Sequence, residues 1–586
     1  MTSLSCFTAL LFVVTLQCQV LVDSLSVVPQ KTPTLQEAAK NDLLKAGGSA
    51  EAYRNIFRYN SKECPEPTEV AGLRLPPDFP RGTYYRNGPG RFKAEDGTQV
   101  MHPFDGDGFV LALQCQPEKV LLTARYIQTP GYVKDIETGK LSGRGVFGTM
   151  KSGGVLANLF DTKIKNVGNT NVAKWGDHVW ALWEGGRPHL LDPVTMETVQ
   201  TEYSAGGKLE ASFSGHPRYD PTSGHWFNFG VDDPDPSTGQ TNIHLYELNE
   251  GVVVSTPTSV TVPGIALMHD FLVTENYILL AWTTCEINNL GGLKAVLGLG
   301  AFVEAVKMTP DTKLLLIPRK LLHDENARNL DATTDPRIKR VPVPFLFNFH
   351  FGNGYEVDDD KLVLDMIETT NEKVSWLLYV LAKQHLSRSS RGIPIKFDFG
   401  VGLIEEGEGA KAPVWEKIDY DKLETFAFSQ YTLDLTNNKL LDKRIITEHG
   451  SIEFPVIPLE LSTKPHRYIY TLASHDPFAD TFGIVGAVCK WDLQQQHEME
   501  YFAFSPDEIA GEPAFVPKNG GRSEDSGYLV VLVNNGKTLT TSFVVFDVEG
   551  EGALTNGPIV RAELPCFVPG PGLHGRFIGG KCAGLK

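Results

Sequence analysis

Short apolar runs between glycine- and proline-rich turns constrain the fold of this chain more than any other feature. Examples are residues 109–113, 178–183, 226–229, 277–282 and 528–533. They are short and rich in the branched and aromatic residues that favour strands over helices. The 56 glycines and 37 prolines lie mostly between such runs, which is typical of a protein with many turns. The pattern predicts an all-β fold.

Many of these runs are apolar on both faces, so both faces of each strand must be covered by other parts of the protein. Stacked blades of a β-propeller meet this requirement. No exact internal repeat is present, so the blades would have diverged in sequence. The length of 586 residues suggests three or four domains by size alone. No segment looks like an interdomain linker, however, and we expect one large domain over residues 70–586.

The N-terminal region has a different composition. Residues 1–24 contain an apolar run at 7–14, which has the length of a signal-peptide core and is short for a bilayer span. No Lys or Arg precedes this run, so a buried strand is the alternative. A targeting segment here predicts the secretory pathway or endoplasmic reticulum, or a plastid reached through a signal-like leader. Residues 25–69 are expected to form a helical extension, because 34–58 has helix-forming composition.

Charge and cysteine content exclude some classes of partner and scaffold. The net charge of −17 argues against nucleic acid, which requires clustered Lys and Arg. It does not exclude a membrane, which an apolar patch can contact without basic residues. Segments 288–308 and 373–386 are apolar and weakly helical, and each is either ordinary core or a peripheral membrane contact around a tunnel entrance. The cysteines show no CxxC spacing, so we expect free thiols or one incidental bridge.

Four of the 15 histidines stand in turns rich in glycine, proline, asparagine or aromatic residues. They are His216, His269, His350 and His574. A single histidine is more often a structural hydrogen-bonding group than a metal ligand, so these four gain weight only as a set. A metal bound by residues so far apart in the sequence requires a fold that gathers strands around one axis.

A series of short motifs accompanies the histidines in a fixed order. They include RNGP at 86–89, HPFDGDG at 102–108, segments 169–172, 181–186 and 191–193, HPRYD at 216–220, IPR at 317–319, HFGNGYE at 350–356, EFP at 453–455, GEPAFV at 511–516 and LHG at 573–575. Together they run from about residue 70 to residue 577. In order and spacing this set resembles the carotenoid cleavage oxygenases, with their four-histidine, non-haem Fe(II) centre.

The resemblance implies a seven-bladed β-propeller with a cap of helices and loops over an iron site. It also implies that His216, His269, His350 and His574 bind Fe²⁺, and that Glu184, Glu453 and Glu512 orient His269, His350 and His574, leaving His216 without a carboxylate. Thr170 aligns with a residue whose methyl group crowds one open position on the metal. His102, Asp105 and Asp107 correspond to structural residues, although a metal site or a general-acid pair is the alternative for them.

The chemistry of such a site is consistent with this resemblance. Four neutral imidazoles suit iron, copper, zinc or nickel, and an octahedral arrangement leaves two positions open. Open positions suit O₂ chemistry, whereas a closed tetrahedral site would suit structural zinc. Each imidazole also needs a partner that accepts a hydrogen bond from its second nitrogen.

The leading hypothesis is therefore an Fe(II)-dependent dioxygenase that uses O₂ to cleave one C=C bond of a carotenoid or apocarotenoid. Its lipophilic polyene substrate would enter through a hydrophobic tunnel. Two alternatives share the fold: a retinoid-type isomerase or stilbene oxygenase on the same iron site, and a non-catalytic propeller that carries carotenoids. A hydrolase or nucleotide-binding protein is not indicated, because the sequence has no GxSxG or GxxxxGK[ST] motif.

Overall fold

The computed structural model describes residues 47–235, 237–369, 426–479, 484–495, 499–568 and 572–580. The architecture below belongs to the compact unit that spans residues 38–586. The expected targeting segment at 1–24 and the expected helix at 373–386 lie outside the described residues. Of the helix expected within 34–58, the described part contains α3 (Ala50–Asn55).

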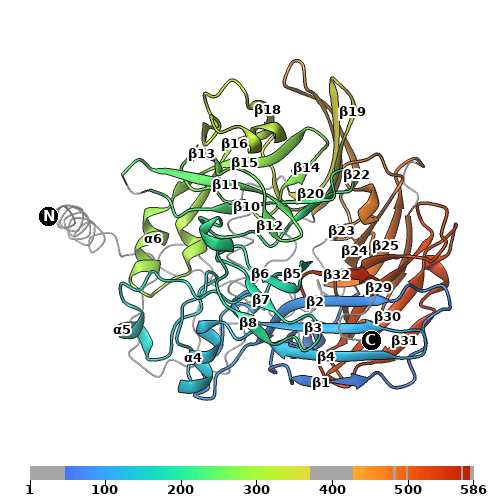
Figure 1. Cartoon of the computed structure of the whole chain (residues 1–586). Coiled ribbons are helices and arrows are strands. Elements are labelled where there is room, and N and C mark those ends of the chain that lie inside the picture. Colours follow the sequence, from blue (N-terminus) through green and yellow to red (C-terminus); the bar gives the residue numbers. More distant parts are fainter. Residues whose placement is uncertain are drawn as a thin grey trace, which may run out of the picture. The chain divides into compact units, whose positions relative to one another are not determined.

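The predicted all-β fold is confirmed, and its seven sheets form a seven-bladed β-propeller (Figure 1). The first blade contains β1 (Cys64–Glu69), β2 (Gly82–Arg91), β3 (Asp107–Cys115), β4 (Val120–Tyr126) and β32 (Gly575–Gly579), and the second contains β5 (Asn171–Trp175), β6 (His178–Leu182), β7 (His189–Leu191) and β8 (Thr198–Gln200). The third blade contains β9 (Arg218–Asp220), β10 (His225–Val231), β11 (Gln240–Asn249), β12 (Val252–Val253), β13 (Thr258–Pro263) and β17 (Asn329–Asp331). The fourth blade contains β14 (Leu272–Val273), β15 (Tyr277–Ile287), β16 (Val306–Pro318) and β18 (Lys339–Val343).

The last three blades follow in chain order. The fifth blade contains β19 (Phe347–Asp358), β20 (Lys361–Thr369), β21 (Ala427–Asp434) and β22 (Lys439–Thr447). The sixth contains β23 (Glu453–Val456), β24 (Tyr468–Ser474), β25 (Val485–Asp492) and β26 (Met499–Ala503). The seventh contains β27 (Glu508–Ala510), β28 (Ala514–Pro517), β29 (Gly527–Asn535), β30 (Thr540–Asp547) and β31 (Val560–Glu563). Neighbouring strands are antiparallel except for β13 and β17, which pair in parallel.

The ring of blades is closed by strands from opposite ends of the chain. β32 pairs with β2, aligning Arg576 with Tyr85 and Gly575 with Arg86. In Figure 1 the red strand β32 accordingly lies beside the blue strand β2. The first blade therefore takes its last strand from the C-terminal segment. Because His574 directly precedes β32, the same pairing also fixes the position of this histidine.

The hydrophobic core lies between the blades, as expected from strands that are apolar on both faces. Every residue of β2 and of β3 is buried. Leu111 and Leu113 of the first blade pack in one cluster with Val530, Leu532 and Phe543 of the last blade. Removing such apolar surface from water is the main driving force of folding. Each blade needs a neighbour on both of its faces, and the closed ring gives every blade two such neighbours.

A buried network of charges fixes the segment between β4 and β5 to the first blade. Asp135 lies in α4 (Pro130–Thr138), and its carboxylate is 2.8 Å from Lys165 Nζ and 3.3 Å from Arg91 Nη1. The same two cations also pair with Asp107. Ser142 donates to Asp135 through both its backbone N–H and its hydroxyl. These contacts agree with the structural interpretation of Asp107.

His102 and Asp105 are structural as well. His102 Nδ1 accepts a hydrogen bond from Phe104 N–H at the start of the 3₁₀ turn η1 (Pro103–Asp105). Asp105 accepts from Thr149 Oγ1 at 2.7 Å and from two backbone N–H groups of the same loop. Burial raises the pKa of Asp105 to about 6, because the charged form is poorly solvated there. The structure thus gives these residues loop-fixing contacts.

Two boundaries differ from expectation. β1 begins at Cys64, so the first sheet includes residues that were assigned to the helical extension ending at residue 69. β1 pairs with β4, and this tertiary pairing outweighs the local composition. The segment 288–308 is only partly helical: it contains α6 (Asn289–Val296) and η3 (Phe302–Ala305), and β16 begins at Val306.

The remaining short elements connect or cover the blades. They are α5 (Gly154–Asn158), η2 (Ala205–Gly207), η4 (Arg319–His323), η7 (Leu459–Leu461) and η8 (Leu554–Asn556). Among the described cysteines, all five are free thiols: Cys64, Cys115, Cys285, Cys489 and Cys566.

Candidate metal centre

The four predicted histidines meet at one point. One ring nitrogen from each of His216, His269, His350 and His574 lies within 4.8 Å of the others. His216 and His574 lie just before β9 and β32, His269 lies before β14, and His350 lies in β19. The fold thus gathers side chains from four blades, and three of the four, His216, His350 and His574, line one cavity.

Three of the histidines have carboxylate partners. His269 Nδ1 is 2.6 Å from Glu184, His350 Nδ1 is 2.5 Å from Glu453, and His574 Nδ1 is 2.8 Å from Glu512. A carboxylate can only accept, so each Nδ1 carries the proton and each Nε2 keeps its lone pair. Glu184 is the most exposed of the three, at 38% of its side-chain area. No carboxylate is bonded to His216 among the described residues.

The ring nitrogens that face the centre are arranged to bind a cation. His216 Nε2 lies only 2.9 Å from His269 Nε2. His350 Nε2 is buried and has no hydrogen-bond partner in the described part of the chain. A buried polar atom without a partner is costly, and several lone pairs directed at one point repel one another. A metal ion at this point would remove both penalties, so the donor set fits a metal.

The electrostatics of the site keep two of the four histidines, His216 and His574, in the neutral form that binds metal. Burial, together with the three other histidines, holds the pKa of His216 well below its ordinary value. Burial also lowers the pKa of His574, although Glu512 opposes this. Burial opposes the charge of Glu512 too, but His574 and Arg86 outweigh it and the pKa of Glu512 is lowered. A neutral imidazole beside an ionised carboxylate is the pair that orients a metal ligand.

His269 differs in this respect. Burial would lower the pKa of His269, but the neighbouring Glu184 outweighs burial and raises it. The pKa of Glu184 is correspondingly lowered by His269. A proton therefore competes with a metal at His269 more strongly than at His216 or His574, because a ligand nitrogen must be deprotonated to bind.

Thr170 lies beside the histidines, where it is buried. Its carbonyl oxygen accepts a hydrogen bond from His574 N–H at 3.1 Å. Its methyl carbon would lie 2.6 Å from a Cβ atom added at Gly215, next to His216. Any side chain at position 215 would therefore clash with Thr170. The expected role of the methyl group, crowding one position on the metal, remains a proposal.

Asp270 and Arg218 are positioning residues that the sequence patterns did not reveal. Arg218 donates to both carboxylate oxygens of Asp270 and, through Nη2, to Phe351 O at 2.9 Å. Asp270 in turn accepts from Phe351 N–H at 2.8 Å. These bonds join the backbone next to His350 with the segments that carry His216 and His269. The sequence signal is that Asp270 directly follows one histidine and Arg218 lies two residues after another.

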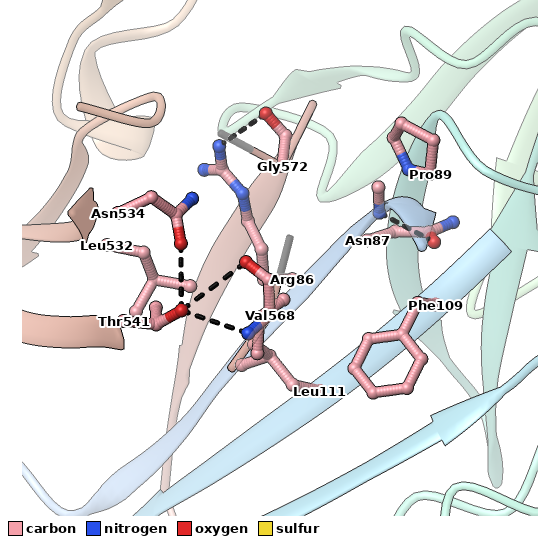
Figure 2. Close-up of a pocket in the computed structure, with 11 residues that line it drawn as sticks. Arg86, Asn87, Pro89, Phe109, Leu111, Leu532, Asn534, Thr541, Val568 and Gly572 are labelled. Atoms are coloured by element: carbon pink, nitrogen blue, oxygen red, sulfur yellow. Dashed lines mark hydrogen bonds between the residues drawn. The ribbon is translucent and has the colours of Figure 1, made fainter. Parts of the chain in front are cut away.

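Arg86 of the RNGP motif supports His574 through its carboxylate partner, Glu512. Its Nη1 lies 3.6 Å from Glu512 Oε2 and donates to Glu512 O at 2.9 Å, while Nη2 donates to Gly572 O at 3.0 Å. Figure 2 shows its guanidinium turned toward Gly572, beside a cavity of about 10 Å³. Such a volume holds at most about one water molecule. Arg86 of β2 thus holds Glu512, the partner of His574, next to the segment that leads into β32.

Aromatic rings pack against the histidines. Phe454 follows Glu453 and stacks on His350, with ring centroids 5.1 Å apart. Its φ of 55° is a left-handed conformation that a bulky residue rarely adopts. Phe349 contacts His269 edge to face, with centroids 5.4 Å apart. These rings limit the movement of the imidazoles and keep water away from them.

A sequence model of the family of the retinal pigment epithelial membrane protein, RPE65, matches residues 57–579. The chain belongs to this family. The predicted resemblance to the carotenoid cleavage oxygenases is thereby confirmed.

Individual members of the family support the same assignment. The chain is 30% identical to the apocarotenoid-15,15'-oxygenase of Synechocystis sp., over 86% of this chain and 91% of that protein. It is 25% identical to carotenoid cleavage dioxygenase 7, chloroplastic, of Arabidopsis thaliana, over 89% and 90% of the two chains. The solved structure of cobalt-substituted Synechocystis apocarotenoid oxygenase superimposes with a TM-score of 0.74 at 29% identity, covering 91% of this chain and all of that one. The predicted enzyme class, an oxygenase, is confirmed.

Proposed function

We propose that this chain is an iron(II)-dependent dioxygenase that cleaves a C=C bond of a carotenoid or apocarotenoid into two carbonyl products. The observation that carries the proposal is the cluster of four histidines, three of them hydrogen-bonded to carboxylates. The names of the two relatives indicate carotenoid-type substrates. The reaction balances, since one C=C bond and one O₂ molecule give two C=O groups.

His216, His269, His350 and His574 would hold the iron. When bound, the iron would supply the redox chemistry with O₂ that organic side chains lack. Glu184, Glu453 and Glu512 hold the Nδ1 protons and so direct the Nε2 atoms inward. Four neutral ligands add no negative charge, so a bound cation would keep its full positive charge at the site.

The decisive experiment is turnover by the iron-loaded full chain with ¹⁸O₂ in ordinary water, using a panel of carotenoids and apocarotenoids. We expect O₂ uptake equal to the substrate cleaved, and one ¹⁸O atom in each carbonyl product when products are reduced at once to stop exchange with water. A polyene that is isomerised without O₂ uptake would instead indicate the isomerase alternative. Cleavage of stilbenes but of no polyene would indicate a stilbene oxygenase, and bound polyene with no reaction a carrier.

We also propose that the protein docks on a membrane through an apolar patch around α5 and α6. Among the described residues, no helix is long and apolar enough to cross a bilayer. Exposed apolar side chains gather on these two helices and the loops beside them: Val155, Leu156, Phe160, Leu290 and Leu299. Leu156 is 87% exposed. The two segments are joined by a hydrogen bond from Phe160 N–H to Val296 O at 2.8 Å. This extends the predicted contact at 288–308 to residues 154–160.

The double variant Leu156→Glu/Leu299→Glu is expected to release the protein from phosphatidylcholine vesicles. Burying one leucine contributes roughly 1.5–3 kcal/mol, so losing two weakens binding by at least about 100-fold. Co-sedimentation with vesicles measures this effect. The matched control, Val252→Glu/Leu441→Glu, changes two exposed apolar residues in other blades and should bind like the wild type. Equal binding of all three proteins would contradict the proposed patch.

The compartment remains a proposal that follows from the leader at 1–24. We propose entry through the secretory pathway, with a plastid as the alternative destination. Imaging of the full chain with a C-terminal fluorescent tag, with and without residues 1–24, tests this proposal.

A further inference from the structure

The inner strands of the propeller enclose a cavity of about 440 Å³ on the central axis. Three of the clustered histidines line it: His216, His350 and His574. Other side chains with hydrogen-bond donors line the same cavity, among them Arg218, Tyr219 and Arg576. A cavity of this size can hold a ligand of several atoms. The placement of the two arginines indicates which kind of ligand it suits.

Arg576 carries hydrogen-bond donors that no described residue accepts from. It lies in β32, and its guanidinium carbon is 4.4 Å from the centroid of the Trp226 ring. Within the described part of the chain, its side chain makes no hydrogen bond and no ion pair. The face of an aromatic ring attracts a cation only modestly and accepts none of its hydrogen bonds in the plane of the guanidinium. All five N–H donors of its planar guanidinium are therefore available to a ligand.

Arg218 adds a second positive charge beside the first. Its Nε and Nη2 atoms are used by Asp270 and by Phe351 O, whereas Nη1 makes no bond to any described residue. Burial lowers the pKa of Arg576 to about 10; Glu512 opposes this shift, and repulsion from the guanidinium of Arg218 adds to it. Two adjacent cations in a partly buried space are unfavourable unless an anion lies between or beside them.

Among the described residues, none of the acidic side chains that line the cavity bonds to Arg576. Asp270 is already paired with Arg218. Glu512 accepts hydrogen bonds from His574 Nδ1 and Gly575 N–H and lies beside Arg86. Glu460 is exposed to solvent, and no described residue bonds to its carboxylate. Glu512 attracts Arg576 electrostatically, but no carboxylate among the described residues bonds to this guanidinium, so its N–H donors stay unused.

We propose that this axial cavity is a binding site for an oxyanion, held by Arg576 and by the free Nη1 edge of Arg218. A guanidinium fork matches two oxygen atoms of one group, as in a carboxylate or a phosphate. Tyr219, which lines the same cavity, carries a hydroxyl that can donate a further bond. The site would bind its anion whether or not the chain cleaves carotenoids, so the two proposals can fail separately.

Isothermal titration of the full-length, metal-loaded protein tests this site without turnover. Sodium acetate and sodium phosphate are the probes, each titrated at an ionic strength held constant with sodium chloride. We expect saturable binding of at least one oxyanion, and the one that binds identifies its class. Arg576→Gln should weaken this binding by at least about tenfold, because the charged fork is lost. The control variant Arg328→Gln, at an exposed arginine outside the cavity, should bind like the wild type.

Two results would overturn the proposal. One is the absence of saturable binding of either probe to the wild type. The other is undiminished binding to Arg576→Gln when its circular dichroism and metal content match those of the wild type. If Arg576→Gln does not fold, Arg576→Lys takes its place, because it keeps the positive charge but lacks the planar fork. A tenfold loss of affinity in Arg576→Lys supports the site, and unchanged affinity contradicts it.

Discussion

His350→Ala is expected to remove both the metal and the oxygenase activity. The Nε2 atom of His350 is buried, faces the other three histidines and has no other partner in the described residues. Alanine cannot replace this donor, and three ligands would remain around a wider opening. Changing a residue that only supports a ligand typically costs 10–100-fold in affinity or activity, so loss of the ligand itself should exceed about 100-fold.

Metal content of the purified protein and O₂ uptake with a cleavable polyene measure this effect. Glu453→Gln provides a graded comparison, because glutamine keeps the shape of the side chain but not the charge that holds His350 Nδ1–H. We expect it to fall 10–100-fold below the wild type. The control His323→Ala changes an exposed histidine that pairs with Glu247, and it should retain metal and activity. Full metal content and activity in His350→Ala would rule out the proposed centre.

Of the substitutions proposed for this chain, Asp135→Ala should cause the largest decrease in the free energy of unfolding. Asp135 is fully buried and accepts hydrogen bonds from Lys165, Arg91 and Ser142. Its removal leaves two buried cations with Asp107 as their remaining buried partner. Breaking a buried ion pair by deleting one member costs about 3–5 kcal/mol, because the other charge stays desolvated. We expect a decrease of this size in the free energy of unfolding.

Urea unfolding followed by tryptophan fluorescence gives this free energy, provided that unfolding is reversible. Asp135→Asn should lose less, because an amide can still accept from Ser142. Asp233→Ala, at an exposed aspartate in the third blade, should remain within about 0.5 kcal/mol of the wild type. A loss below about 1 kcal/mol in Asp135→Ala would show that solvent reaches the network and screens its charges.

The strand content was predictable from sequence because burial on both faces leaves a local pattern, as in β3 and β29. The number of blades and the metal ligands came from the family resemblance, not from any local pattern. β17 could not be predicted, because it leaves its neighbours in sequence to join the previous blade beside β13. The same limit applies to Asp270 and Arg218: Arg218 lies in β9 and Asp270 just before β14, so their pairing depends on how two neighbouring blades pack, which no sequence spacing records.

The early start of β1 has a similar cause. Its segment, Cys64–Glu69, contains two prolines and two glutamates, a composition that does not favour strands. β1 lies at the edge of its sheet, where proline is tolerated since one side of the strand makes no ladder bonds. Pairing with β4 therefore decides the conformation of this segment.

The joining of β2 to β32 also has a consequence for synthesis of the protein on the ribosome. β32, which pairs with β2, and the last histidine of the cluster are translated together, after every other described strand. Until they emerge, β2 is an unpaired inner edge open to pairing with another chain. A nascent or truncated chain that ends before residue 574 would lack both the strand that closes the ring and the fourth imidazole. Assembly of the complete histidine cluster thus requires that translation has passed residue 574 and the strand that follows it.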